Sequence, residues 1–223
     1  FGELPAVAEE LDGIVREEGG ADLRGVLPGR VLLNQAFTAD GLAEMLGQGY
    51  PLVHLATHFS FRPGTAGDSF LLLGDGGRLS LSELESRRYP FKFIDLLTLS
   101  ACDTAVGGAD AQGREIESFA ALAQKRGAGA ILATLWPVAD VSTGAFMQLF
   151  YQLRNEHELS KAEALREVQN RFLTGAHEMP APDREHRGVE VVGEDEDGFA
   201  PPTHAPFAHP FYWAPFILMG NFL

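Results

Sequence analysis

The feature that most constrains the fold of this chain is a short, mostly apolar run, Ile94–Leu99, followed closely by the only cysteine, Cys102. A run of this length and composition is typical of a strand buried on both faces, as in a parallel sheet. A second run of the same kind, Pro51–Thr57, is followed directly by His58. Open α/β folds place functional side chains just beyond the carboxyl ends of such strands. We therefore expect His58 and Cys102 to lie at the same edge of one sheet.

A thiol beside an imidazole can form a catalytic dyad. A free thiol has a pKa of about 8.5, and a neighbouring imidazole lowers that pKa and can later protonate a leaving amine. Backbone N–H groups of Cys102 and of the residues after His58 can stabilise a tetrahedral oxyanion. This chemistry predicts attack on a peptide carbonyl, an acyl-enzyme and its hydrolysis. The alternative from the residues alone is an inert core cysteine and a structural histidine.

Length and composition limit the classes of protein to which the chain can belong. With 223 residues, of which 45% are hydrophobic, we expect one domain with a full core. A single cysteine excludes an internal disulfide framework and indicates a reducing compartment, which we take to be the cytoplasm. The net charge of −14 argues against a nucleic-acid partner or an anionic membrane surface, and no apolar run approaches the roughly 20 residues of a membrane span. Because the chain begins at Phe1 rather than Met, we expect it to be a fragment of a longer protein.

Apolar spacing, caps and turn residues predict an alternation of helices and strands. The predicted helices are Leu4–Glu18, Thr38–Gly49, Ser80–Arg88, Arg114–Arg126, Asp140–Asn155 and Ser160–Leu173. The predicted strands are Arg30–Asn34, Pro51–His58, a hairpin of Ser69–Leu73 with Arg78–Ser80, Ile94–Leu99, Ala130–Leu135 and an edge strand in Phe211–Phe222. The order of the first two strands around a helix predicts that they pair in parallel. We expect the long connection Gly175–Pro210 to be mobile or to be a processing site.

Five segments of the sequence resemble the CHAT family of caspase-like proteins, in the order of that family and over nearly the whole chain. They are HLATHFSF (54–61), SFLLLGDGG (69–77), LLTLSACDTAVGG (96–108), GREIESFAALAQKRGAGAILATLWPVAD (113–140) and HPFYWAPFILMGN (209–221). The resemblance implies a single caspase-like domain over residues 1–223. It also implies an α/β fold, a three-layer α/β/α sandwich with a mostly parallel central sheet.

The resemblance further implies a cysteine endopeptidase that needs no cofactor. The family's dyad is the His of its ATH motif and the Cys of its SAC motif, which correspond to His58 and Cys102. Many relatives have Gly after the His, and its N–H helps to form the oxyanion hole; here Phe59 occupies that place and still supplies an N–H. Such domains commonly follow tetratricopeptide or other sensing repeats. They are associated with bacterial signalling through cleavage of a dedicated protein partner.

Several other residues invite a functional interpretation. Three acids, Asp103, Asp68 and Asp140, are candidates for a pocket that binds a basic residue next to the cleaved bond, although helix capping explains them equally well. The spacing of His54 and His58 resembles a metal motif, but the required Glu is absent and the segment is predicted to be a strand. We therefore expect no metal site.

The sequence leaves three hypotheses for function. The first is a cysteine endopeptidase that acts on a protein or peptide substrate through Cys102 and His58. The second is a catalytically idle module whose pocket only binds a peptide in signalling. The third is a thiol acyl-hydrolase that acts on small substrates.

Overall fold

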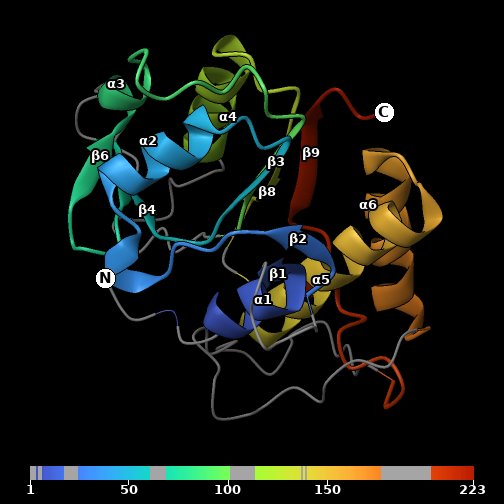
Figure 1. Ribbon diagram of the computed structural model, residues 1–223. Coiled ribbons are helices and arrows are strands. Elements are labelled where there is room, and N and C mark those ends of the chain that lie inside the picture. Colours follow the sequence, from blue (N-terminus) through green and yellow to red (C-terminus); the bar gives the residue numbers. More distant parts are fainter. Residues whose placement is uncertain are drawn as a thin grey trace. The chain divides into compact units, whose positions relative to one another are not determined.

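The computed structural model describes residues 4, 7–17, 25–60, 69–100, 114–136, 138, 140–176 and 202–223, without the side chains of 114–118, 140 and 141. The chain divides into two compact units, drawn with their elements in Figure 1. The first unit comprises Phe1–Gly2, Leu32–Pro137 and Ile217–Phe222. The second unit comprises Glu3–Val31, Val138–Phe216 and Leu223.

A four-stranded sheet forms the centre of the first unit. Its strands, in spatial order, are β3 (Leu52–Leu55), β7 (Leu96–Leu99), β8 (Ala130–Thr134) and β9 (Phe216–Gly220). Strand β7 pairs in parallel with both β3 and β8, and every residue of β7 and β8 is buried. Helix α4 (Arg114–Lys125) connects β7 to β8 and contacts β8. The predictions of an α/β fold, a mostly parallel central sheet and an edge strand at the C-terminus are confirmed.

A smaller antiparallel sheet lies in the same unit. Its strands are β4 (Phe59–Ser60), β5 (Phe70–Leu72) and β6 (Arg78–Ser80), in that spatial order. Strands β5 and β6 form the predicted hairpin, and Gly76 in its turn has a φ of 83°, a conformation that favours glycine. Helix α3 (Leu81–Leu84) follows at once, and Ser80 caps it through a reciprocal pair of bonds with Glu83. Leu71, Leu79 and Leu84 of this region are almost wholly buried.

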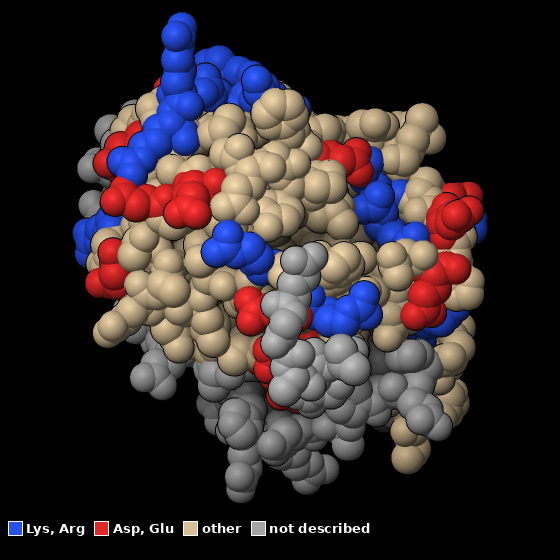
Figure 2. All heavy atoms as spheres, in the orientation of Figure 1, with Lys and Arg blue, Asp and Glu red and all other residues tan. Residues whose placement is uncertain are grey.

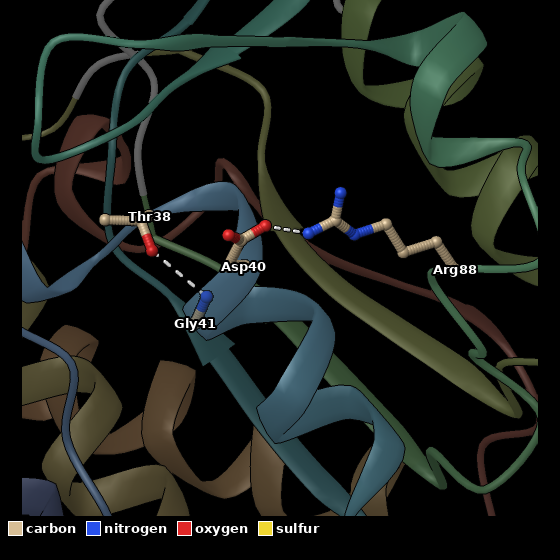
Figure 3. Close-up of polar contacts among 4 residues, drawn as sticks. All are labelled: Thr38, Asp40, Gly41 and Arg88. Atoms are coloured by element: carbon tan, nitrogen blue, oxygen red, sulfur yellow. Dashed lines mark hydrogen bonds and ion pairs between the residues drawn. The ribbon is translucent and has the colours of Figure 1, made fainter.

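Helix α2 (Ala39–Gly47) begins where the sequence predicts a cap. The Thr38 hydroxyl accepts a hydrogen bond of 3.0 Å from the Gly41 N–H, as Figure 3 shows. In the same view the Asp40 carboxylate forms an ion pair with Arg88, which follows α3. Both partners are exposed, so this pair adds little stability. The ion pair nevertheless shows that the segment after α3 lies beside the start of α2.

The second unit consists mainly of packed helices. They are α1 (Val7–Ile14), α5 (Asp140–His157), α6 (Lys161–Thr174) and the 3-10 turn η2 (Pro210–Tyr212). Helix α5 packs against both α1 and α6, and Phe146 of α5 stacks on Phe216 with ring centroids 3.6 Å apart. The predicted capping box of α6 is confirmed, because Ser160 and Glu163 exchange hydrogen bonds. Lys161 is buried and donates to the carbonyl of Leu223 at 2.7 Å.

Two predictions in the N-terminal part of the chain are wrong. The first helix ends at Ile14, because the next three residues form β1 (Val15–Glu17), which pairs in parallel with β2 (Leu27–Gly29). No strand forms at residues 30–34 of the described chain. Instead, Asn34 has a φ of 51°, which is incompatible with a strand, and it begins the 3-10 turn η1 (Asn34–Ala36). The parallel partner of β3 is therefore β7, from much later in the sequence.

Residues 177–201 of the connection expected to be mobile lie outside the described residues. Of the helices in the described part of the chain, none combines the length and the apolar character needed to cross a bilayer.

Candidate active site

His58 lies between two strands of the first unit. Strand β3 ends at Leu55, and β4 begins at Phe59, so the run predicted as one strand to His58 is broken. The reason is a change of partner: Leu55 belongs to the parallel ladder with β7, whereas the carbonyl of His58 accepts the N–H of Leu72 at 2.9 Å. His58 itself is 4% exposed. The imidazole is thus carried by backbone that is tied to a neighbouring hairpin.

A threonine that the sequence analysis did not single out reinforces this tie. The Thr57 hydroxyl donates a hydrogen bond of 2.5 Å to the carbonyl of Leu72, and Thr57 is 9% exposed. Leu72 is therefore bonded through its N–H to His58 and through its carbonyl to Thr57. The alternation of apolar and polar residues at Phe59, Ser60 and Phe61 is a weak sequence signal for the short strand β4.

The register of the central sheet relates the two candidate catalytic positions. Leu55 of β3 is paired with Leu99 of β7, and the Ser100 N–H donates to the Leu55 carbonyl at 2.9 Å. His58 follows Leu55 by three positions, and Cys102 follows Leu99 by three positions. The segment that leads to His58 and the segment that leads to Cys102 therefore both begin at the carboxyl edge of the parallel sheet, after strand residues that are paired with each other. Cys102 itself lies outside the described residues.

The backbone of Phe59 points away from its paired strand. Phe59 is opposite Leu71, and Ser60 is opposite Phe70. In an antiparallel pair, hydrogen-bonded and non-hydrogen-bonded positions alternate. Because the carbonyl of His58 bonds to the Leu72 N–H, the next position along, Phe59, is a non-bonded one. Its N–H and carbonyl are directed to the side of β4 opposite β5.

The side chain of Phe59 is partly buried and packs against the hydrophobic core. Its ring meets that of Phe119, from α4, edge to face at 5.7 Å between centroids. Phe119 is 1% exposed. This contact joins β4 to the helix that follows the Cys102 region in sequence. Where the resemblance implies a glycine, this chain has an aromatic residue that anchors the start of β4.

The acids predicted to line a pocket are not placed beside His58 by the described residues. Asp140 is the first residue of α5 in the second unit, and its side chain is not described. Asp68 and Asp103 lie outside the described residues. The pocket assignment therefore stays a prediction.

The described histidine and acidic side chains do not form a metal site. Among them, no group of three or more His, Cys, Asp or Glu side chains could hold a metal ion. His54 lies within β3, where it is paired with Thr98 of β7, so its spacing from His58 is not that of a helical metal motif.

Comparison with known proteins assigns the family. The sequence model of the CHAT domain matches residues 1–221, which is essentially the entire chain. The chain belongs to the CHAT domain family. Among curated proteins, none matches it. CHAT domains are a caspase-like family related to cysteine peptidases, so the family and the caspase-like α/β fold predicted from the sequence are confirmed.

Proposed function

We propose that this CHAT domain is a cysteine endopeptidase in which Cys102 is the nucleophile and His58 is the general base and acid. The observation that carries the proposal is the β3–β7 register. In that register Leu55, the last residue of β3, is paired with Leu99, the last residue of β7. His58 and Cys102 each follow their paired residue by three positions, at the same edge of the parallel sheet. Family membership supports the same assignment, because the family is related to cysteine peptidases.

The proposed reaction uses only residues of this chain. His58 removes the proton of Cys102, and the thiolate sulfur attacks the carbonyl carbon of a peptide bond. The backbone N–H groups of Phe59 and Cys102 donate to the resulting oxyanion. The outward direction of the Phe59 N–H supports this role. His58 then gives its proton to the leaving amine, and water hydrolyses the acyl-enzyme.

The first test exploits the single cysteine of the chain, because any thiol label reports on Cys102 alone. The rate of iodoacetamide labelling is measured at about pH 6.5 for the wild type and for His58→Ala. An imidazole that lowers the thiol pKa by one unit raises the thiolate fraction below that pKa about tenfold. We therefore expect labelling of His58→Ala to be roughly tenfold slower than that of the wild type.

A matched control is His157→Ala, which changes an exposed histidine at the end of α5. This variant should be labelled at the wild-type rate. Equal rates for the wild type and His58→Ala would overturn the dyad.

The second test measures peptide cleavage. Peptides with Arg, Lys, Asp or Met on the amino side of the scissile bond are incubated with the wild type and with Cys102→Ala. We expect cleavage by the wild type only, with preference for the basic residues because the chain is acidic. Cleavage by both proteins at the same rate would contradict the proposed nucleophile, and turnover of small esters without peptide cleavage would contradict an endopeptidase.

A further inference from the structure

Five cations gather on the surface of the first unit, although the chain as a whole has a net charge of −14. We call this group the basic patch; it consists of Arg87, Arg88, Lys92, Lys125 and Arg126. Figure 2 shows Lys and Arg side chains gathered over the region of α3 and the upper end of α4. Five cations within residues 87–92 and 125–126 are a local cluster that the overall negative charge does not explain.

Two contacts bring the two sequence segments of the patch together. The Arg126 guanidinium donates to the Ser86 carbonyl at 2.9 Å, across 40 positions of sequence. Gly127 lies so close to the other segment that an added Cβ would be 2.8 Å from the Cα of Lys92. The end of α4 therefore lies directly against residues 86–92, and the cations of both segments share one surface.

The carboxylates nearby only partly neutralise the patch. Arg88 forms an ion pair with Asp40, and Lys125 lies 4.0 Å from Glu85. Arg87, Lys92 and Arg126 have no carboxylate partner within the described part of the chain. Arg87 and Lys92 are exposed and available to an external anion, and the half-buried Arg126 adds positive charge beside them. Two more cations belong to exposed ion pairs that a stronger partner can compete for.

An exposed aromatic ring lies within the patch. Phe93 is 54% exposed, and the Lys92 ammonium lies 4.5 Å from its ring centroid. The ring rests beside Gly49, where an added Cβ would be 3.7 Å from it. An exposed aromatic side chain among cations is typical of a protein–protein interface, because aromatic and arginine side chains are enriched where proteins bind one another.

The patch lies away from the candidate active site. Lys92 precedes β7 and Arg126 precedes β8, so both lie at the amino ends of parallel strands. His58 follows the carboxyl end of β3, which is parallel to β7. The patch is therefore a separate surface at the opposite edge of the sheet, and a role for it does not depend on the proposed peptidase activity.

We propose that the basic patch docks an acidic segment of a partner protein that also carries an apolar side chain. The uncompensated cations would contact Asp or Glu of the segment, and Phe93 would contact its apolar residue. Charge complementarity favours this occupant. A long polyanion such as a nucleic acid extends past a patch of five cations and meets the acidic remainder of the surface, which repels it.

The test measures binding of a short fluorescent peptide made of Glu residues around a central Leu, by anisotropy with the 223-residue chain. The patch variant is Arg87→Glu with Lys92→Glu, since both side chains are exposed and their charges are not needed for an ion pair in the fold. We expect this double reversal to weaken peptide binding at least about tenfold. Phe93→Ala should weaken binding of the Leu peptide but not of an all-Glu peptide.

The matched control is Arg16→Glu with Arg166→Glu, which makes the same charge change at two exposed arginines of the second unit. This control should bind the Glu–Leu peptide as the wild type does. Equal weakening in both double variants, or no saturable binding by the wild type, would overturn the proposal. A single-stranded DNA of equal charge that binds more tightly than the peptide, with the same dependence on Arg87 and Lys92, would also overturn it in favour of a nucleic acid.

Discussion

The Thr57 side chain links the segment that carries His58 to the hairpin next to it. Its hydroxyl donates a hydrogen bond to the carbonyl of Leu72. The N–H of the same residue, Leu72, donates to the carbonyl of His58. Thr57 is 9% exposed, so removal of the hydroxyl leaves a buried carbonyl with one bond fewer. At the scale of single residues, the position of the candidate base depends on this one contact as well as on its own backbone bond.

Thr57→Val is expected to destabilise the protein by about 1 kcal/mol, because it removes a buried hydrogen bond at nearly constant volume. Urea denaturation measures the change. The same variant should slow the labelling of Cys102 at about pH 6.5, since His58 is held less firmly. Thr57→Ser keeps the hydroxyl and should retain the labelling rate; a rate as slow as that of Thr57→Val would argue against a positioning role for the hydroxyl.

At Gly127 the backbone conformation and the lack of space both exclude a side chain. Its φ is 105°, and an added Cβ would lie 2.8 Å from the Cα of Lys92. Gly127→Ala should therefore cost more than about 1 kcal/mol of unfolding free energy. The matched control is Gly47→Ala in α2, where no atom lies within 4 Å of the added Cβ. This variant should be neutral or should raise the free energy of unfolding by up to about 1 kcal/mol. Similar thermal stability of the two variants would contradict this account.

Among the secondary-structure elements, the short helix α3 begins with a capping box. The Ser80 hydroxyl and backbone N–H both donate to the Glu83 carboxylate, at 2.6 and 2.9 Å, and the Glu83 N–H donates back to Ser80. Ser80→Ala should lower the free energy of unfolding by about 1 kcal/mol. The matched control is Ser86→Ala, because Ser86 is exposed and its hydrogen bonds in the described residues use backbone atoms. This variant should change the free energy of unfolding by less than about 0.5 kcal/mol. A larger loss in Ser86→Ala than in Ser80→Ala, measured by urea denaturation, would contradict the role of the cap.

The same cap makes stability depend on pH. The hydrogen bond from the Ser80 hydroxyl, and then that from the Ser80 N–H, lower the pKa of Glu83 from its usual range. The pKa of Glu163 is lowered in the same way by Ser160. A lowered pKa in the folded state stabilises the fold above the ordinary glutamate pKa, and this stabilisation is lost as the pH falls through the folded-state value. Titration by NMR should give Glu83 a lower pKa in the wild type than in Ser80→Ala; an equal pKa in both would contradict the stated cause.

For the whole molecule, net charge is the dominant electrostatic property. The formal charge is −14 at pH 7, and the isoelectric point is near 4.8. Mutual repulsion at neutral pH opposes association, and this repulsion vanishes as the charge approaches zero. We expect light scattering to show a solubility minimum close to pH 4.8 and no aggregation at pH 7 in low salt. Constant solubility from pH 7 through pH 4.8 would contradict this expectation.

Features with local causes could be predicted from the amino-acid sequence alone. The caps at Thr38, Ser80 and Ser160 and the buried runs of β7 and β8 follow from residues that are close together in the chain. The candidate dyad residues could also be named, because a histidine and the only cysteine follow two strand-like runs. Local hydrogen bonds and periodic burial are determined within a few positions of sequence, so the sequence was sufficient for them.

Features that depend on distant partners were decided only by the tertiary structure. The pairing of β3 with β7, the start of β4 directly after His58 and the outward backbone of Phe59 each require hydrogen bonds between residues that are far apart in sequence. The basic patch likewise forms because the end of α4 lies against residues 86–92, where Arg126 donates to the Ser86 carbonyl and Gly127 approaches Lys92. Residue type determines which groups can bond, but the choice of partner depends on the burial of the whole sheet, and no local pattern contains that information.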